Sequence, residues 1–437
     1  MRRKLLVPLL LLSLIITVLC ISVYAEPVRY GDLNGDEKVN STDYVLLGRY
    51  ILGKIDVFPA TDDTSIADLD RNSKINSTDY TILKRYILGI ITEIPIGSIP
   101  ASPTPTIPNT GTPGIGYTGR FDFSDSKGPR FAWTASTITA NFEGTEVKAT
   151  IKSQGDNWFN VIIDGVVKTP ININNTTKTI TLASGLSNGK HNVTLFKRTE
   201  AQVGVTQFLG FDFGSGKLLA PPPEAERKIE FIGDSITCAY GNEGTDKSQP
   251  FTPPNENSYM SYASITCRAL NADQICVSYS GKGVVSNYGG NTNELMPFLY
   301  PRIMPQESTT WDYSKWTPDV VVINLGTNDF SVSAPGESSF VNAYKDLVKK
   351  VRSQYPDAHI FCTMGPMLWG DSITICRGYL NKVVDSYNSA GDKKVYFLEY
   401  PQQQESDGYG EDWHPSIKTH QKMADLLTSA IKEKLGW

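Results

Sequence analysis

One acidic phrase occurs twice near the start of the chain. The copies, DLNGDEKVNSTDY at residues 32–44 and DLDRNSKINSTDY at residues 68–80, align without a gap at an offset of 36 residues. Each runs into an apolar segment, YVLLGRYILGKI or YTILKRYILGII, whose hydrophobic residues recur at helical spacing. The repeat therefore predicts two matching units, each made of a loop followed by a helix.

Oxygen-bearing side chains fall at positions 1, 3, 5, 9 and 12 of each loop, and a lysine at position 7 offers its backbone carbonyl. A loop that carries hard oxygen ligands at this spacing folds around a calcium ion. The predicted ligands of the first copy are Asp32, Asn34, Asp36, Lys38, Asn40 and Asp43. Those of the second copy are Asp68, Asp70, Asn72, Lys74, Asn76 and Asp79. We therefore expect two structural Ca²⁺ ions; for one copy taken alone, a solvated acidic turn is the alternative.

The paired loops resemble the type I dockerin domain of cellulosomal enzymes. The resemblance includes the pairs Ser41-Thr42 and Ser77-Thr78, which in that family face the cohesin partner. It implies attachment to the cohesin domain of a cellulosome scaffold protein. The sequence departs from a complete EF-hand in having Asp at position 12, and Glu37 and Ser73 at position 6, where glycine is usual.

The residues on either side of this repeat indicate export and a linker. The start, MRRKLLVPLLLLSLIITVLCISVYAEP, has a basic head, an apolar run and a small-residue site, and this predicts a signal peptide cleaved before Glu26. An uncleaved membrane anchor is the alternative. After Pro95, IGSIPASPTPTIPNTGTPGIG is too rich in Pro, Thr, Ser and Gly to fold by itself. We expect a secreted, extracellular protein, attached to the cellulosome and with no membrane contact after cleavage.

The charge and the cysteine content argue against some classes of partner and chemistry. A net charge of −5 without a basic stripe argues against nucleic acid as a partner. Five cysteines follow the signal segment, and none is in a CxxC spacing suited to zinc or redox chemistry. We interpret them as buried apolar residues, with room for one disulfide in an exported protein.

Short β-rich runs punctuated by turn residues extend from about Tyr117 to Leu219, among them TITANFEG, EVKATIKS and HNVTLFKRT. This rhythm predicts an antiparallel β-sandwich. Trp133 and Trp158 would bind carbohydrate if exposed, but we favour a packing role for both.

From Arg227 apolar strands alternate with helical stretches, as in KIEFIG, QICVSYS, DVVVINLG and HIFCTMG. Continuous apolar strands with crossover helices predict a parallel sheet covered on both faces. The predicted order is a signal peptide at 1–25, a dockerin at 26–95, a linker at 96–116, a β-sandwich at 117–222 and an α/β/α domain at 223–437.

Polar residues stand at the ends of the predicted strands, where parallel sheets bind ligands. Ser235 lies in FIGDSITC, Gly281 in YSGKG and Asn328 in NLGTNDF, while His414 lies in EDWHPS ahead of the last helix. Ser235 is the expected nucleophile and His414 its general base. The N–H groups of Ser235 and Gly281 and the side-chain amide of Asn328 are the expected donors to an oxyanion.

The order Ser, Gly, Asn, His resembles the SGNH (GDSL-like) hydrolases, and with the preceding sandwich it resembles carbohydrate esterase family 2. This implies a jelly-roll-like sandwich, an α/β/α hydrolase and a serine acetyl esterase of the acetylxylan esterase type. Its substrate would be acetylated plant polysaccharide such as xylan or glucomannan, and catalysis would need no cofactor. Two alternatives stay open: a non-catalytic polysaccharide-binding module with an esterase-like cleft, and a lipase or thioesterase on the same scaffold.

The group that orients the base is where the sequence departs from its superfamily. Asp usually stands three residues before the histidine, but here that residue is Glu411 and the aspartate, Asp412, lies two before. We expect the Asp412 carboxylate to hold His414; Glu411, or a backbone carbonyl that would leave a Ser–His dyad, are the alternatives. Trp369 and Trp413 are the expected sugar-binding platforms, although either could pack instead. The remaining histidines are interpreted as structural or solvated: His191, His359 and His420.

Overall fold

The computed structural model describes residues 30–60, 64–69, 75–87, 94 and 114–437. The predicted signal peptide, most of the predicted linker, and Asp70, Asn72 and Lys74 lie outside these residues. The chain divides into two compact units, Met1–Pro103 and Thr104–Trp437. Among the described residues, no helix has both the length and the apolar character needed to cross a bilayer.

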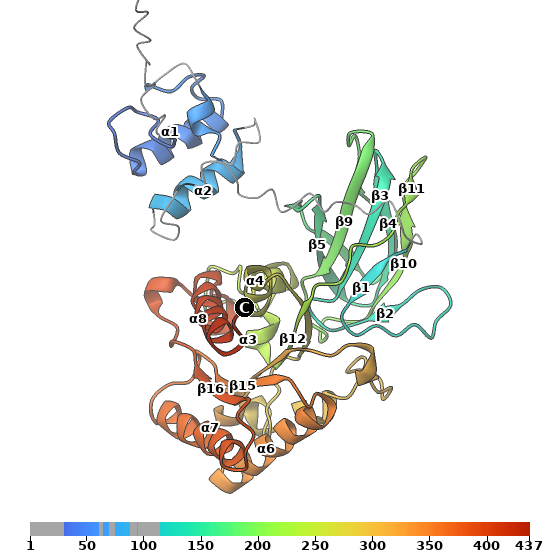
Figure 1. Ribbon diagram of the computed structural model, residues 1–437, viewed down its shortest axis with the longest axis vertical. Helices are drawn as coiled ribbons and strands as arrows, with labels where there is room; N and C mark the ends of the chain where they lie inside the picture. Colours follow the sequence, from blue (N-terminus) through green and yellow to red (C-terminus); the bar gives the residue numbers. More distant parts are fainter. Residues whose placement is uncertain (1–29, 61–63, 70–74, 88–93, 95–113) are drawn as a thin grey trace, which may run out of the picture. The chain divides into compact units, whose positions relative to one another are not determined.

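The first unit contains the acidic repeat, and its two copies fold alike (Figure 1). Helices α1 (Ser41–Ile51) and α2 (Ser77–Ile87) begin and end at equivalent residues, with the short 3₁₀ helix η1 (Thr64–Ala67) before the second loop. The Tyr44 and Tyr80 rings, which occupy the same place in each copy, stack with their centroids 3.9 Å apart. The loop-plus-helix prediction is therefore confirmed for the described residues.

A sandwich of two antiparallel sheets opens the second unit. The seven-stranded sheet has the order β1-β3-β9-β5-β6, with β11 paired to β3 and β7 to β5, and the four-stranded sheet has the order β2-β10-β4-β8. The strands are β1 Gly116–Thr118, β2 Arg130–Phe131, β3 Thr137–Gly144, β4 Val147–Ser153, β5 Asp156–Ile163, β6 Val166–Val167, β7 Ile171–Asn174, β8 Thr177–Ala183, β9 Gly189–Lys197, β10 Thr206–Asp212 and β11 Lys217–Leu218.

Burial in the sandwich follows the two-residue period of a strand. Along β4, Val147, Ala149 and Ile151 point into the core between the sheets. Trp133 is buried where the sandwich meets the rest of the unit, which agrees with a packing role. Trp158 is half-buried, and its indole N–H is enclosed.

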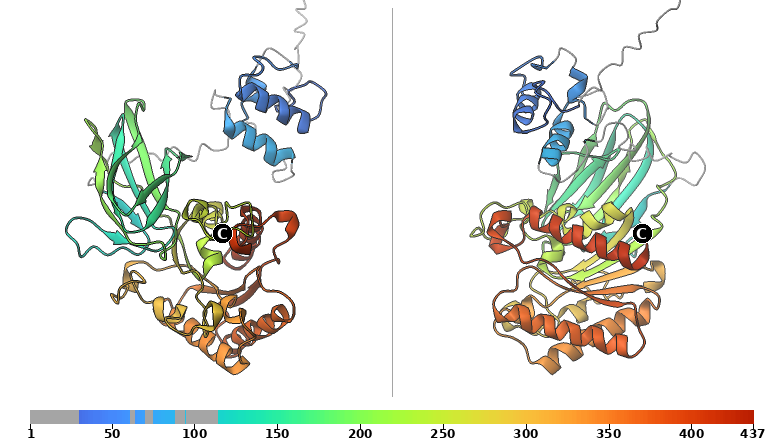
Figure 2. Two further views of the ribbon diagram at one scale, coloured as in Figure 1. Left: turned by 180° about the vertical axis from the view of Figure 1, so that it is seen from behind. Right: turned by 60° about the vertical axis from the view of Figure 1, so that its left-hand side comes forward.

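The rest of the second unit is a parallel five-stranded sheet with the order β13-β12-β14-β15-β16. Successive strand residues face opposite sides: Val320 and Val322 belong to one apolar cluster, Val321 and Ile323 to the other. Helices α4 and α8 cover the first face, and α6 and α7 cover the second (Figure 2). The α/β/α prediction is therefore confirmed. The elements are β12 Arg227–Gly233, α3 Ser235–Cys238, α4 Tyr262–Leu270, β13 Ala272–Ser278, α5 Met296–Leu299, β14 Val320–Asn324, α6 Glu337–Gln354, β15 His359–Met364, α7 Asp371–Ser389, β16 Val395–Glu399 and α8 Ile417–Leu435.

Buried polar contacts join the sandwich to the parallel-sheet domain. Arg120 of the sandwich donates to Glu230 of β12 at 2.8 Å, and both side chains are fully buried. Tyr300 donates its hydroxyl to the other oxygen of Glu230 at 2.9 Å. Removal of one partner from such a pair costs about 3–5 kcal/mol, because it leaves an uncompensated buried charge. The two domains therefore form a single compact unit.

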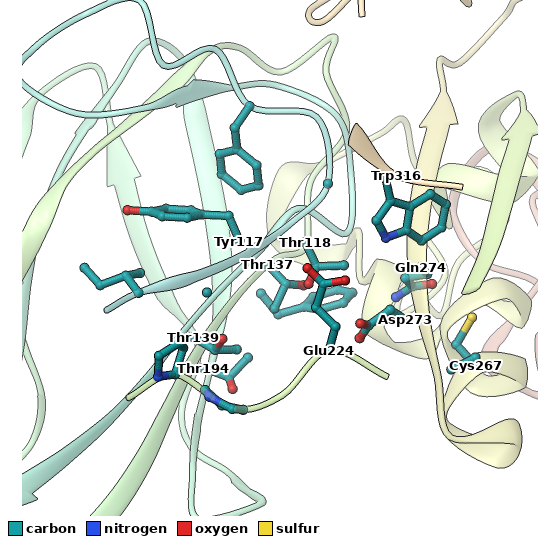
Figure 3. Close-up of a pocket in the computed structure, with 18 of the residues that line it drawn as sticks. Tyr117, Thr118, Thr137, Thr139, Thr194, Glu224, Cys267, Asp273, Gln274 and Trp316 are labelled. Atoms are coloured by element: carbon teal, nitrogen blue, oxygen red, sulfur yellow. The ribbon is translucent and has the colours of Figure 1, made fainter. Parts of the chain in front are cut away.

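A groove of about 590 Å³ lies at this junction (Figure 3). Strands β1, β3 and β9 contribute hydroxyl side chains to it, and the segment from α4 to β13 contributes Cys267, Asp273 and Gln274. It shares no lining residue with the pocket around Ser235 described below.

Candidate active site

The turn after β12 places Ser235 at the carboxyl edge of the sheet. Gly233 is required there, because a Cβ at that position would lie 2.1 Å from Thr237 Oγ1. Asp234 caps the following helix α3 by accepting from the Ile236 N–H at 3.1 Å. Burial raises the pKa of Asp234 to about 7. The Gly-Asp-Ser sequence is thus a tight strand-to-helix turn that presents the serine.

All seven residues predicted for this domain's site line one pocket of about 660 Å³. They come from four strand ends and the loop ahead of α8, although they are far apart in the sequence. The seven are Ser235, Gly281, Asn328, Trp369, Asp412, Trp413 and His414.

Main-chain carbonyls orient His414. Its Nδ1 lies 3.0 Å from the carbonyl oxygen of Asp412 and 3.2 Å from that of Glu411. Because a carbonyl can only accept, Nδ1 carries the proton, and the lone pair of Nε2 is free to act as a base.

The expectation that the Asp412 carboxylate holds His414 is therefore wrong. That carboxylate instead accepts from the Tyr240 hydroxyl at 2.7 Å. The Glu411 carboxylate is buried and accepts from Thr252 N at 2.7 Å and from Asn255 Nδ2 at 2.6 Å, so it holds a loop. In the structure, therefore, backbone carbonyls rather than a carboxylate contact the imidazole, as in the backbone-carbonyl alternative.

Two residues with a left-handed backbone conformation direct these carbonyls toward His414. Asp412 and Trp413 have φ values of 47° and 61°, in the left-handed region that side chains other than glycine seldom adopt. Hydrogen bonds to a neighbouring loop fix the turn: Asp412 N donates to Gln249 O at 3.0 Å, and Trp413 N donates to Lys247 O at 3.1 Å. A strained backbone conformation of this kind is retained only where the surrounding contacts hold it in place.

The surroundings of the imidazole favour its neutral form. Burial lowers the pKa of His414 to about 4, although the hydrogen bonds to the two carbonyls oppose that shift. The Tyr240 ring stacks on the imidazole with the centroids 4.2 Å apart. Within the described residues, neither Ser235 Oγ nor His414 Nε2 has a hydrogen-bond partner, so both are available to substrate.

The three expected oxyanion donors differ in availability. Neither the Ser235 N–H nor the Gly281 N–H has an acceptor in the described part of the chain, and Gly281 lies in a turn with φ of 77°. Asn328 Nδ2 donates to Asp234 Oδ2 at 3.2 Å and to the Lys282 carbonyl at 3.0 Å. Both of its hydrogens therefore have protein acceptors.

Aromatic side chains border the pocket. Trp369 and Trp413 are 82% and 52% exposed, so neither is a core residue, and Tyr288 is 74% exposed. Sequence reasoning missed Tyr288, Tyr240 and Gln202, all of which line the pocket. Gln202 comes from the loop between β9 and β10 of the sandwich, and no local pattern signals such a contact.

The other histidines and the cysteines have structural surroundings. His191 contacts Asp164 at 2.7 Å, His359 contacts the Tyr396 hydroxyl at 3.0 Å, and His420 Nδ1 accepts from Tyr262 N. The five described cysteines are buried and free, which confirms their interpretation as apolar residues.

In the described parts of the acidic loops, backbone N–H groups donate to the expected ligand side chains. Asp32 accepts from Gly35 N and Glu37 N, each at 2.8 Å. Glu37 has φ of 64°, so it adopts the conformation usually given to glycine at position 6. Asp43 is buried and accepts from Leu33 N and Asn40 N, each at 2.8 Å.

The second loop repeats these contacts 36 residues later. Asp79 accepts from Leu69 N at 2.7 Å and from Asn76 N at 2.8 Å. Carboxylate oxygens keep further lone pairs in this arrangement, so the donor set fits a hard divalent cation.

Three family descriptions match the chain in succession. Residues 30–88 match the dockerin type I domain, residues 117–223 match the carbohydrate esterase 2 N-terminal domain, and residues 229–427 match the GDSL-like lipase/acylhydrolases.

Two proteins illustrate the similarity in sequence. The cellulase/esterase CelE of Acetivibrio thermocellus is 58% identical over 410 residues, which are 94% of this chain, but this chain spans only 50% of that protein. An acetylxylan esterase / glucomannan deacetylase of Cellvibrio japonicus is 31% identical over 322 residues, which are 70% of this chain and 86% of the relative.

A solved structure extends the similarity to the fold. A family two carbohydrate esterase from Clostridium thermocellum, in complex with cellohexaose, is 60% identical with a TM-score of 0.73. The match covers 74% of this chain and 100% of that one. One relative is matched over most of its own length, and one solved structure is matched over its whole length. The chain therefore belongs to carbohydrate esterase family 2, and it carries a type I dockerin domain.

Proposed function

We propose that the protein is a secreted, cellulosome-attached esterase that removes O-acetyl groups from plant cell-wall polysaccharides. One observation carries the proposal. Ser235 and His414 share a pocket whose Ser235 and Gly281 N–H groups, like His414 Nε2, have no partner among the described residues, and exposed tryptophans border it. The similarity to an acetylxylan esterase / glucomannan deacetylase supports acetylated xylan or glucomannan as substrate.

In the acylation step, His414 Nε2 takes the hydroxyl proton of Ser235 while Oγ attacks the acetyl carbonyl carbon. The carbonyl electron pair moves onto oxygen, and the N–H groups of Ser235 and Gly281 stabilise the resulting oxyanion. When the intermediate collapses, the bond to the sugar oxygen breaks. That oxygen takes the proton from His414 and leaves as a hydroxyl group.

Deacylation repeats these steps with water. His414 takes a proton from the water, whose oxygen bonds to the acyl carbon. Collapse breaks the bond to Ser235 Oγ, which regains the proton, and acetic acid is released and ionises. The carbonyls of Asp412 and Glu411 keep Nδ1 protonated throughout, so Nε2 is the atom that exchanges protons.

The exposed aromatic rings suit a sugar chain better than a lipid. Trp369 and Trp413 offer flat apolar faces at the open side of the pocket, and sugar rings commonly stack on such faces. Long acyl chains need an enclosed apolar channel instead. We therefore place the polysaccharide across these tryptophans and the acetyl group next to Ser235.

The N-terminal unit is the proposed attachment module. Asp32, Asn34, Asp36, Asn40 and Asp43, with the Lys38 carbonyl, would hold one Ca²⁺; the equivalent residues from Asp68 to Asp79 would hold a second. Ser41 and Thr42 are exposed at the start of α1, where a cohesin domain could contact them.

Acetate release from acetylated xylan and glucomannan, compared with hydrolysis of longer acyl esters, tests the proposal. We expect acetate from both polysaccharides and poor activity on long chains. Preference for long chains would indicate a lipase or thioesterase. Tight polysaccharide binding without acetate release would indicate a non-catalytic binding module.

A further inference from the structure

The sandwich domain reaches into the active site through the loop between β9 and β10, residues 198–205. Gln202 of this loop lines the catalytic pocket. Two residues earlier, the fully buried Glu200 accepts from the Ser280 N–H at 2.9 Å. A carboxylate of one domain thus holds the backbone of a catalytic turn in the other.

The turn that Glu200 contacts carries an expected oxyanion donor. Ser280 directly precedes Gly281, whose N–H has no acceptor in the described part of the chain. The contact with Glu200 anchors the peptide plane immediately before the one that carries the Gly281 N–H, and the two dihedrals of Ser280 join these planes. Glu200 Oε2 also lies 3.7 Å from the Cys238 sulfur, in the helix that begins with Ser235.

The main chain of Glu200 is held by two buried neighbours. Its own N–H donates to Glu256 Oε2 at 2.8 Å, and its carbonyl accepts from Lys197 Nζ at 3.1 Å. Lys197 and Glu256 are also fully buried. Burial lowers the pKa of Lys197 to about 7 and raises the pKa of Glu200, so a neutral lysine and a protonated carboxyl are both favoured here. Either form of Glu200 can accept from the Ser280 N–H.

We propose that Glu200 is a positioning residue of the hydrolase, which fixes the Ser280–Gly281 turn so that the Gly281 N–H points at the developing oxyanion. The sandwich is then part of the catalytic machinery. This inference rests on the proposed esterase function, and it goes further by assigning a role to a residue outside the hydrolase domain.

Glu200→Ala tests the inference through two readouts, hydrolysis of 4-nitrophenyl acetate and the rate at which diethyl 4-nitrophenyl phosphate phosphorylates Ser235. Both reactions place an oxyanion beside Gly281. We expect kcat and the phosphorylation rate to fall by about 10- to 100-fold, because a misplaced donor loses most of its effect. KM should change by less than about twofold, since ground-state binding is untouched. Glu200→Gln should restore most of the rate, because its amide oxygen can accept the same N–H.

Glu230→Gln is the matched control. Glu230 is equally buried and also joins the sandwich to the hydrolase, but it contacts Arg120 and Tyr300. We expect this variant to melt at a lower temperature with kcat unchanged. Should Glu200→Ala fail to fold, Glu200→Asp keeps a carboxyl group at this position while withdrawing it from Ser280, and the same fall is expected.

The outcomes distinguish the inference about Glu200 from the proposed esterase function. A folded Glu200→Ala or Glu200→Asp protein with unchanged kcat and phosphorylation rate overturns the inference. An equal loss of kcat in Glu230→Gln also overturns it, because the effect would then come from the domain junction. An unmutated protein that neither hydrolyses the ester nor reacts with the phosphate overturns the proposed function, and the inference with it.

Discussion

Asp412→Asn distinguishes a main-chain carbonyl from a carboxylate as the group that orients the base. The substitution keeps the backbone carbonyl that lies 3.0 Å from His414 Nδ1. It also keeps a side-chain oxygen that can accept from Tyr240, as Asp412 does at 2.7 Å. Asparagine tolerates the left-handed φ of 47° at this position, whereas alanine would add strain.

The expected loss is small. The one property removed is an exposed negative charge near the imidazole. The interaction energy between two exposed charges is about 0.2–1 kcal/mol. In rate this is at most about fivefold. Where a carboxylate is itself the orienting group, the same substitution costs about 10⁴ in kcat.

The assay is kcat on 4-nitrophenyl acetate and on acetylated xylan, with thermal melting to check the fold. Tyr240→Phe is the control, because it breaks the same contact but keeps both the charge and the ring on His414. A folded Asp412→Asn protein that loses three orders of magnitude, while Tyr240→Phe does not, would refute the carbonyl assignment.

Three further predictions follow from the site and the acidic loops. Because burial lowers the pKa of His414 to about 4, the base stays neutral above that pH, and kcat/KM should fall only as the pH drops through about 4; an acid limb near 6.5 in a pH profile would contradict this. Trp369→Ala should raise KM for acetylated xylan by about three- to tenfold and leave 4-nitrophenyl acetate unaffected, with Trp369→Phe as the control; equal effects on both substrates would exclude a sugar platform. Calcium removal should reduce helical circular dichroism and abolish cohesin binding while acetate release persists, and indifference of both signals to chelator would rule out calcium loops.

The residues of the site could be predicted because each stands where its element ends. Ser235, Gly281 and Asn328 follow apolar strands, and in a parallel sheet those ends meet at one edge. The acidic repeat was equally informative, since two copies at one offset require two equal folds.

The orientation of His414 could not be predicted, because it depends on backbone dihedrals rather than on residue types. The spacing of Asp412 from His414 suggested a carboxylate contact. The left-handed turn at Asp412 and Trp413 instead brings main-chain oxygens to Nδ1, and that turn depends on hydrogen bonds to Lys247 and Gln249. Glu200 and Gln202 were missed for a related reason: they reach the site through packing between domains, which leaves no local pattern.

The most direct test compares acetate released from acetylated xylan by the unmutated protein and by Ser235→Ala, with polysaccharide binding measured in parallel. The account predicts steady acetate release by the unmutated protein and a loss of at least about 10³ in Ser235→Ala, with binding retained. Equal acetate release by the two proteins, or none from the unmutated protein, would contradict it.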